Sequence, residues 1–374
     1  MSKRRLGVLI GGSGLIGGTI VNYYQTVHPD DVDIRAPSSK KLSIRQEDSI
    51  RRYLQEVQPD FVINAAMANL GADGQLSYEV NYLGPVNLAR AATALGIPYI
   101  HISSAATLPA GENLSEDDTL AISPALSNYA KSKLMAEATL RLMAEKEGLD
   151  YSCVRLAIVY GAHDHKVQGF HRLLFSIADE SMPLLFTKRD TLHSYTNARK
   201  LPYFIEHMLT NRQEFRHQTY NFVDKNPVDL ATLILTIKSY LQLSHPKEIY
   251  VPYWLANSGR NSLKILLRLL RRIGLKATLP PELMFLESFY KPQTLRRDKL
   301  DGSSFVDPMP EETIFTALPE LVVYYLTRWS HENQISTYNM SFEKEIKDEE
   351  KFNTNPQGLL EIIHTKGIGP FTDM

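Results

Sequence analysis

The chain has 374 residues, of which 43% are hydrophobic and 22% are charged. Both fractions are typical of folded soluble proteins and exclude disordered, collagen-like and membrane-embedded chains. Its 41 basic and 42 acidic side chains leave a net charge of -1, so no overall field attracts polyanions and we expect no nucleic-acid partner. The length suits two domains or one large one. The single cysteine, Cys153, excludes an intramolecular disulfide, and we expect a cytoplasmic protein.

The N-terminal stretch admits two interpretations. A basic segment at residues 3–5 before an uncharged run to Val21 resembles a secretory signal, but six glycines in that run disfavour the helix that such a signal forms. Residues 6–10 instead predict a buried strand and residues 19–27 an amphipathic helix. The glycine spacing between them is typical of turns that let backbone approach a pyrophosphate at a helix N-terminus. We expect six residues there to bind a dinucleotide: Gly11, Ser13, Gly14, Leu15, Ile16 and Gly17.

The rest of the first half alternates strand and helix patterns. The predicted strands are residues 32–34, 60–64, 97–103 and 151–159, and the predicted helices are residues 47–57, 82–95 and 128–147. This alternation indicates a parallel sheet flanked by helices, with ligands bound beyond the carboxyl ends of the strands. We therefore predict the α/β class and a Rossmann-type, doubly wound parallel sheet. Cys153, in the last of these strands, is expected in the core.

Arg35 follows the second predicted strand, where an acidic side chain would bind the ribose 2′-hydroxyl of NAD. An arginine cannot accept that hydrogen bond, but it can pair with a 2′-phosphate. Lys40 and Lys41 lie just beyond. The sequence thus favours NADP over NAD as cofactor. The alternative is that Arg35 is a solvated loop charge.

Tyr129 and Lys133 are four residues apart at the start of a predicted helix, so both project from one face. A nearby ammonium favours the phenolate, and we expect it to lower the tyrosine pKa so that Tyr129 exchanges a proton with a carbonyl or alcohol. Ser104 ends a predicted strand at the ligand-binding edge and is the expected hydroxyl that polarises the substrate oxygen. Taken alone, the Tyr-x-x-x-Lys spacing also suits an exposed helix turn.

These motifs together occur in the order and spacing of the extended short-chain dehydrogenase/reductase family. The chain resembles that family over residues 3–242, and segments 59–66 and 80–90 are most similar to its nucleotide-sugar 4-keto reductases and epimerases. The resemblance implies that Ser104, Tyr129 and Lys133 are catalytic and that Lys133 also holds the nicotinamide ribose. It further implies that Asn81 supports a proton relay and that Ala65 and Ala66 border the cofactor.

The resemblance also bears on the substrate and the reaction. It makes His171 and Arg189 the expected substrate contacts, although Arg189 suits a surface ion pair equally well. Relatives that epimerise carry a cysteine where this chain has Ala106, and dehydratases carry an Asp-Glu pair in place of Ala105 and Ala106. Keto reduction or alcohol oxidation is therefore expected. The histidines at 163, 165 and 171 are read as a polar loop, and we expect no metal.

Beyond about residue 245 the resemblance fades. Residues 260–276 carry six basic and no acidic side chains among leucines at helical spacing, which suits either contact with an anionic membrane or a packed helix with a solvated basic face. A helix is expected to start at Pro310, residues 341–351 to form an exposed helix or tether, and the tail from Gly367 to fray. The expected organisation is residues 1–165, a Rossmann domain with the catalytic residues; 166–300, a smaller substrate lobe mixed with the last Rossmann elements; and 301–374, a helical extension.

Three hypotheses of function follow. The first is an NADP-dependent oxidoreductase that reduces a 4-keto nucleotide sugar. The second keeps this chemistry with a sterol- or lipid-type substrate reached from a membrane surface. The third is a catalytically silent, NADP-binding regulator, since a fold and its residues do not prove turnover. A homodimer is also considered.

Overall fold

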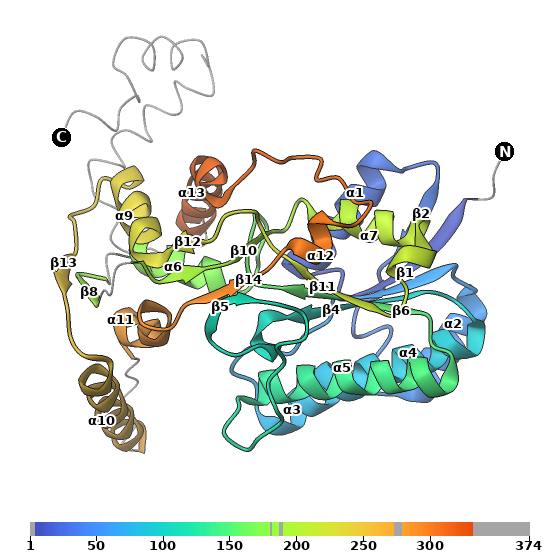
Figure 1. The fold of residues 1–374 in the computed structure, drawn as a ribbon, viewed down its shortest axis with the longest axis horizontal. Helices are drawn as coiled ribbons and strands as arrows, with labels where there is room; N and C mark the ends of the chain where they lie inside the picture. Colours follow the sequence, from blue (N-terminus) through green and yellow to red (C-terminus); the bar gives the residue numbers. More distant parts are fainter. Residues whose placement is uncertain (1–3, 180–181, 187–189, 273–278, 332–374) are drawn as a thin grey trace, which may run out of the picture. The chain divides into compact units, whose positions relative to one another are not determined.

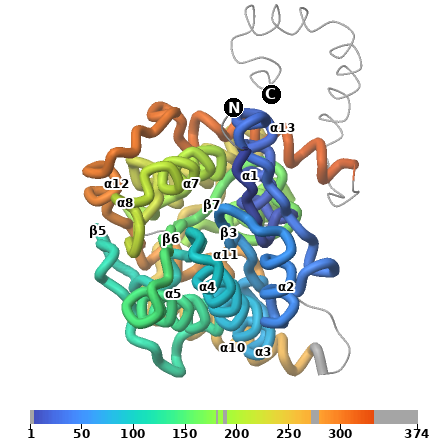
Figure 2. The backbone as a smooth tube through the Cα atoms, turned by 90° about the vertical axis from the view of Figure 1, so that its right-hand side faces the viewer, coloured from blue at the N-terminus to red at the C-terminus, as the bar shows by residue number. Residues whose placement is uncertain are grey.

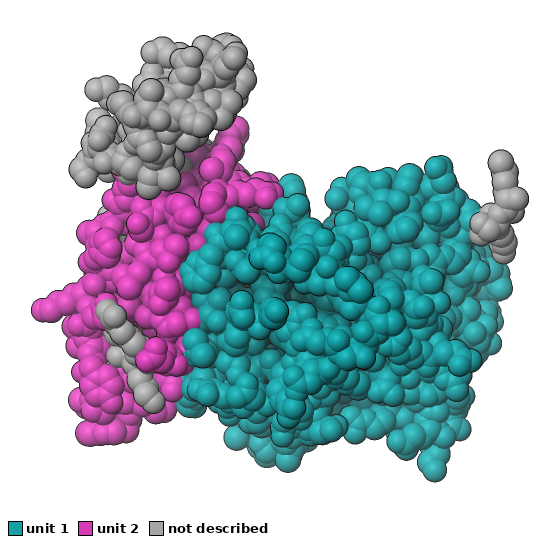
Figure 3. Space-filling view, turned by 45° about the horizontal axis from the view of Figure 1, so that its top comes forward, with its two compact units in different colours: residues 1–171, 192–228, 291–317 teal, residues 172–191, 229–290, 318–374 magenta. Residues whose placement is uncertain are grey.

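The computed structural model describes residues 4–179, 182–186, 190–272 and 279–331 (Figure 1). The chain divides into two compact units (Figure 3). Unit 1 comprises residues 1–171, 192–228 and 291–317, and unit 2 comprises residues 172–191, 229–290 and 318–374. The expectations for residues 341–351 and for the tail from Gly367 concern residues outside those described.

A six-stranded parallel sheet forms the centre of unit 1, in the order β11-β6-β4-β3-β1-β2. The strand order reverses between β1 and β3, and doubly wound sheets bind their ligands beyond the carboxyl ends of the strands at such a reversal. The sheet confirms the predicted α/β class. Its strands are β1 (Arg5–Ile10), β2 (Val32–Arg35), β3 (Phe61–Asn64), β4 (Tyr99–Ser104), β6 (Tyr151–Leu156) and β11 (Gln218–Phe222).

Helices cover both faces of this sheet (Figure 1). On one face α1 (Leu15–Val27) and α7 (Leu201–Thr210) bury their apolar sides against the strands. On the other face lie α2 (Glu47–Val57), α4 (Gly84–Leu95) and α5 (Asn128–Glu147), which run next to one another (Figure 2). Burial of these two apolar layers is the main source of the unit's stability.

Two predicted elements are divided in the structure. The strand predicted at residues 151–159 breaks at Ala157, whose N–H leaves the ladder and is donated to Thr196 Oγ1 at 3.1 Å. Its second part, β7 (Ile158–Tyr160), pairs with β10 (Tyr195–Asn197) in a separate sheet. The helix predicted at residues 82–95 consists of a π-helical turn, η1 (Glu79–Leu83), followed by α4.

The shorter elements form smaller layers. A second sheet orders β5 (Gly111–Leu114), β9 (Leu192–His193), β12 (Val228–Asp229) and β14 (Gln293–Leu295) as β12-β9-β14-β5. The short helices are α3 (Gly74–Tyr78), η2 (Ala105–Thr107), α8 (Arg212–Phe215) and α12 (Asp298–Asp301). In unit 2, β8 (Leu184–Phe186) pairs with β13 (Lys247–Ile249). The helices there include α9 (Leu230–Tyr240), α10 (Tyr253–Arg272), α11 (Pro281–Met284) and η3 (Leu286–Phe289).

Two helices, α6 (Gly169–Ala178) and α13 (Ile314–His331), begin in unit 1 and end in unit 2. The start predicted for α13 at Pro310 is wrong. The helix begins after Thr313, whose carbonyl and hydroxyl oxygens accept the N–H groups of Ala317 and Thr316, so Thr313 acts as the cap. No helix in the described part of the chain is long and apolar enough to cross a membrane.

Candidate active site

The glycine-rich turn joins β1 to α1 and packs closely against its neighbours. Gly11 has a φ of +90°, and a Cβ placed on it would lie 2.6 Å from Ala66 N. A Cβ on Gly17 would lie 2.1 Å from Gly11 O, so the first turn of α1 contacts the end of β1 directly. Both positions therefore require glycine.

Gly14 leaves the first N–H groups of α1 without a side-chain cap. It is the N-cap residue, and it has no side chain to accept the N–H groups of the first helical turn. Those donors, with the positive end of the helix dipole, suit an anionic group. This geometry leaves the predicted pyrophosphate site at the turn possible in space and charge, and binding there by Ser13, Gly14, Leu15 and Ile16 stays a prediction.

Arg35 is the last residue of β2 and pairs in register with Val8 of β1. The next residue, Ala36, lies so close to the glycine-rich turn that a Cβ on Gly12 would be 2.6 Å from its Cβ. About half of the Arg35 side chain is exposed, and its Nε is 3.5 Å from the Asp33 carboxylate. Arg35 is therefore next to the turn and open to solvent.

The loop after β3 lies against the glycine-rich turn. Ala65 N–H donates to Ile10 O at 2.9 Å, and Ala66 N–H donates to the buried Asn64 Oδ1 at 3.1 Å. Asn81, in η1, accepts from Ala68 N–H at 2.8 Å. The Asn81 side chain is completely buried, and its Nδ2 donor has no partner in the described part of the chain.

Ser104 and Tyr129 meet at the carboxyl end of β4. Ser104 is the last residue of that strand, and Tyr129 lies in the first turn of α5, which starts where the Ser127 hydroxyl accepts Ala130 N–H. The Tyr129 side chain lies close to the Ser104 hydroxyl. Burial raises the pKa of Tyr129, and the nearby Ser104 hydroxyl opposes that shift.

Lys133 lies one helical turn after Tyr129 and is 2% exposed. Its Nζ donates to Ile102 O at 2.8 Å, and burial lowers its pKa from 10.5 to about 8. The expectation that this ammonium lowers the Tyr129 pKa is wrong for this arrangement, since burial dominates and the pKa is raised. The physical reason is the low local dielectric, which penalises the phenolate.

A buried polar cluster of Ser103, Glu137 and Arg155 lies next to Lys133 and was not predicted from the sequence. Glu137, one turn after Lys133, accepts from Ser103 Oγ and pairs with Arg155 at 2.7 Å, and both charged side chains are buried. The neighbouring His101 is completely buried, and burial, with a smaller contribution from Lys133, holds its pKa well below the usual value. The i, i+4 spacing of Lys133 and Glu137 was a signal that could have pointed to this cluster.

Two further residues singled out in the sequence, His171 and Cys153, are buried. His171, in α6, is buried, with its Nδ1 3.1 Å from Lys166 O and 4.0 Å from the Asp164 carboxylate. Arg189 lies outside the described residues. Cys153 is buried in β6, as predicted, and burial raises its pKa. Among the described residues no three His, Cys, Asp or Glu side chains are grouped as a metal site.

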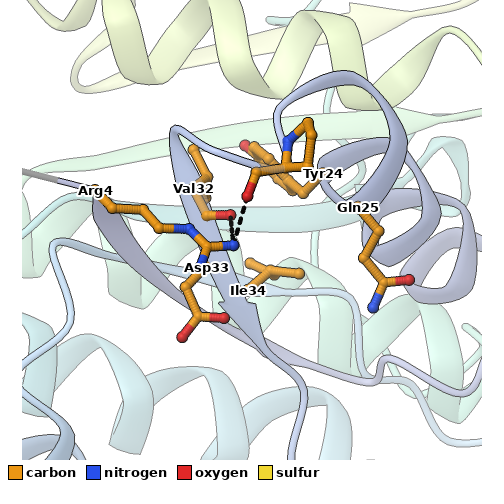
Figure 4. Close-up of a pocket in the computed structure, with 7 residues that line it drawn as sticks. Arg4, Tyr24, Gln25, Val32, Asp33 and Ile34 are labelled. Carbon is orange, nitrogen blue, oxygen red and sulfur yellow. Dashed lines mark hydrogen bonds between the residues drawn. The ribbon is translucent and has the colours of Figure 1, made fainter.

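A separate pocket of about 200 Å³ lies at the opposite edge of the sheet, where β1 and β2 begin (Figure 4). In it Arg4 Nη2 donates to the carbonyl oxygens of Pro29 and Val32 at 2.6 and 3.3 Å. Because dinucleotides bind beyond the carboxyl ends of the strands, this pocket is not part of the candidate site. Its lining residues are Arg4, Tyr24, Gln25, Pro29, Val32, Asp33 and Ile34.

Comparison with known proteins decides the family. Residues 8–221 match the model of the NAD dependent epimerase/dehydratase family. The chain belongs to this family. The match confirms the resemblance to extended short-chain dehydrogenases/reductases and falls within the residues that carry it.

Two curated proteins are similar to part of this chain. The spore coat polysaccharide biosynthesis protein SpsK of Bacillus subtilis (strain 168) is 26% identical over 158 residues, which are 41% of this chain and 52% of that protein. The GDP-L-fucose synthase of Dictyostelium discoideum is 25% identical over 175 residues, 44% of this chain and 54% of that protein. The chain thus spans about half the length of the curated relatives it matches.

A solved structure shares the fold. The dTDP-4-dehydrorhamnose reductase of Bacillus anthracis, in complex with NADP, aligns with a TM-score of 0.61 over 86% of this chain and 99% of that chain. The two are 16% identical, so the likeness concerns the fold alone.

Proposed function

We propose that this epimerase/dehydratase family member is an NADP-dependent oxidoreductase that reduces the keto group of a nucleotide sugar. The observation that carries the proposal is that Ser104 and Tyr129 lie close together at the carboxyl end of β4, with Lys133 one helical turn away. Doubly wound folds hold their ligands beyond the carboxyl ends of the strands, which is where this pair of hydroxyl groups lies.

The glycine-rich turn and Arg35 suit a nicotinamide dinucleotide. The turn from Gly11 to Gly17 has no room for side chains at its two closest contacts and leaves first-turn donors for a pyrophosphate. Arg35, half exposed beside that turn, would pair with a 2′-phosphate, which favours NADP. The description of the family names NAD, whereas the reductase that shares the fold is in complex with NADP. The preference for NADP over NAD in this proposal therefore rests on Arg35 alone.

In this proposal Tyr129 is the proton donor of the reduction. Its raised pKa keeps the phenol protonated at neutral pH, so that it can donate to the carbonyl oxygen of the substrate while Ser104 hydrogen-bonds the same region. When bound, a reduced nicotinamide supplies the hydride. The unpartnered Asn81 Nδ2 offers a further donor behind the site, consistent with the proton relay that the family resemblance implies.

Two neighbouring positions support reduction without a second reaction. Ala105 and Ala106, in η2, follow Ser104 directly and offer no acid or base for dehydration or epimerisation. The nucleotide-sugar substrate rests on the similarity to proteins described as GDP-L-fucose synthase and dTDP-4-dehydrorhamnose reductase. His171 and Arg189 remain our proposed substrate contacts, and residues 1–165, 166–300 and 301–374 our proposed functional divisions.

A substrate panel tests the proposal. Purified full-length protein is incubated with NADPH and either 4-keto nucleotide sugars or hydrophobic ketones such as sterol ketones, and NADPH oxidation is followed. We expect turnover with a nucleotide sugar. Turnover only with hydrophobic ketones would favour a sterol- or lipid-type dehydrogenase, and tight NADPH binding with no turnover on any ketone would favour a silent, NADP-binding regulator.

A further inference from the structure

Helix α10 of unit 2 presents an apolar face to solvent. Trp254 is 69% exposed, and four further large apolar residues of the helix are about half exposed. Such a cluster on one helix is unusual for a surface that faces only water. The five residues are Trp254, Leu255, Ile265, Leu266 and Leu269.

The exposed apolar residues lie on one side of the helix. At about 100° per residue they fall within an arc of about 120°, and its centre is opposite the buried Leu267. The buried side anchors α10 to unit 2, since Arg260 pairs with Glu287 at 3.0 Å and the rings of Tyr253 and Tyr290 lie 5.5 Å apart. Packing among the described residues of the unit therefore leaves the apolar arc uncovered.

A basic edge borders this arc. Lys264 and Arg268 are exposed, lie one turn apart, and fall next to Trp254 on the helical projection. The twenty residues of α10 include no aspartate or glutamate. An outward apolar face with a cationic edge is complementary to an anionic lipid surface, where apolar side chains enter the headgroup region and lysine or arginine pairs with phosphate.

A second copy of the chain fits this face less well. An antiparallel twofold pairing of two α10 helices would bring the same edges together, so Lys264 and Arg268 would meet their own counterparts and repel. The sequence left open a packed helix with a solvated basic face, but here the apolar arc as well as the basic edge is in solvent.

We propose that α10 binds the surface of an anionic lipid bilayer. The contact is peripheral, with Trp254 and its four apolar neighbours in the headgroup region and Lys264 and Arg268 on lipid phosphates. It goes beyond the proposed reductase activity and does not depend on it, because no residue of α10 belongs to the candidate active site.

Vesicle flotation of the full-length protein tests this proposal. We expect the protein to float with vesicles of phosphatidylcholine and phosphatidylglycerol at low salt, and less at high salt because the Debye length shortens. Binding to pure phosphatidylcholine should be much weaker. Absence of flotation with anionic vesicles at low salt would overturn the proposal, as would equal binding to neutral vesicles.

Two paired variants locate the contact. Lys264→Ala with Arg268→Ala should weaken partitioning about 30-fold, from the contribution of each basic group at an anionic surface. The matched control is Arg51→Ala with Lys146→Ala, two exposed basic residues in unit 1, which should leave binding unchanged. Ile265→Ser with Leu269→Ser should also reduce binding, whereas Ile122→Ser with Val306→Ser, exposed elsewhere, should not. Equal losses in the control variants would overturn the assignment to α10.

Tryptophan fluorescence gives an independent readout. The chain has two tryptophans, and Trp329 is buried, so a change in polarity around α10 is reported by Trp254. We expect a blue shift of emission with anionic vesicles that disappears in Trp254→Phe. A blue shift that grows with protein concentration without vesicles, and is lost in Ile265→Ser with Leu269→Ser, would instead assign the face to a second copy and overturn the lipid proposal.

Discussion

At the scale of single residues, burial determines which candidate catalytic groups carry a proton. Tyr129 is 8% exposed, and burial raises its pKa, so the phenol stays protonated at neutral pH. Lys133 is more deeply buried, and the same physical effect acts in the opposite direction on a cation. The order Tyr129 then Lys133 along α5 could be predicted from the sequence. Their pKa directions could not, because they depend on tertiary burial.

The lowered pKa of Lys133 predicts a pH-dependent contribution to stability. Between about pH 8 and the ordinary lysine pKa of 10.5, Lys133 binds a proton in the unfolded chain but not in the folded chain. The free energy of unfolding therefore rises as the pH increases from about 8 to 10.5. Below about pH 8 Lys133 is charged in both states, and its burial lowers the stability of the folded chain by the full amount. Lys133→Met should therefore raise the free energy of unfolding at pH 7, by up to about 3 kcal/mol, and abolish activity. Urea unfolding at a series of pH values measures the effect.

The control for this experiment is Lys146→Met, at the exposed end of the same helix. It should change stability by less than about 0.5 kcal/mol. A gain from Lys133→Met that is the same at pH 7 and pH 10 would contradict the assigned pKa shift.

The position of Arg35 predicts that the protein binds NADPH more tightly than NADH. If its guanidinium pairs with a 2′-phosphate, the wild-type protein binds NADPH about 10- to 100-fold more tightly than NADH, and Arg35→Ala removes the difference. Fluorescence titration with both cofactors measures it, with Arg51→Ala on α2 as the control. Equal affinities of the wild type for the two cofactors would refute the role of Arg35.

At the scale of elements, α5 connects the candidate catalytic residues to the sheet. Tyr129 contacts Ser104 of β4, Lys133 donates to the β4 backbone, and Glu137 pairs with Arg155 of β6. A buried ion pair fixes geometry more than it adds stability. The bounds of α2 and α5 matched their predicted ranges because a regular pattern of apolar residues is a local signal, whereas the Glu137 pair joins distant segments.

The glycine-rich turn gives a prediction at the same scale. Gly17→Ala places a Cβ about 2 Å from Gly11 O, so it should displace α1 from β1, lower the free energy of unfolding by about 3 kcal/mol and abolish NADPH binding. Gly18→Ala, the next residue, makes only ordinary contact at 3.7 Å and should stabilise α1 slightly. Thermal unfolding and NADPH titration of both variants compare them, and similar behaviour of the two would contradict the close packing of the turn.

At the scale of the whole molecule, the parallel sheet could be predicted from sequence and the division into units could not. The strands β1, β2, β3, β4 and β6 alternate with helices along the chain, so local patterns suffice to predict them. Unit 1, however, includes β14, which pairs with β5 although about 180 residues separate them. The exposure of the apolar arc of α10 could not be predicted from the sequence either, because a helix packed in the protein interior has the same pattern of apolar residues.

The central claim is that Tyr129 donates the proton in an NADPH-dependent keto reduction. Tyr129→Phe removes only the hydroxyl, and the control Tyr240→Phe removes the same group from an exposed tyrosine of α9. The direct measurement is kcat/KM for each variant on the ketone that the panel identifies, together with the Kd for NADPH. We predict a loss of about 100- to 10,000-fold for Tyr129→Phe with NADPH binding retained, and no loss for Tyr240→Phe. Unchanged turnover in Tyr129→Phe would contradict the account.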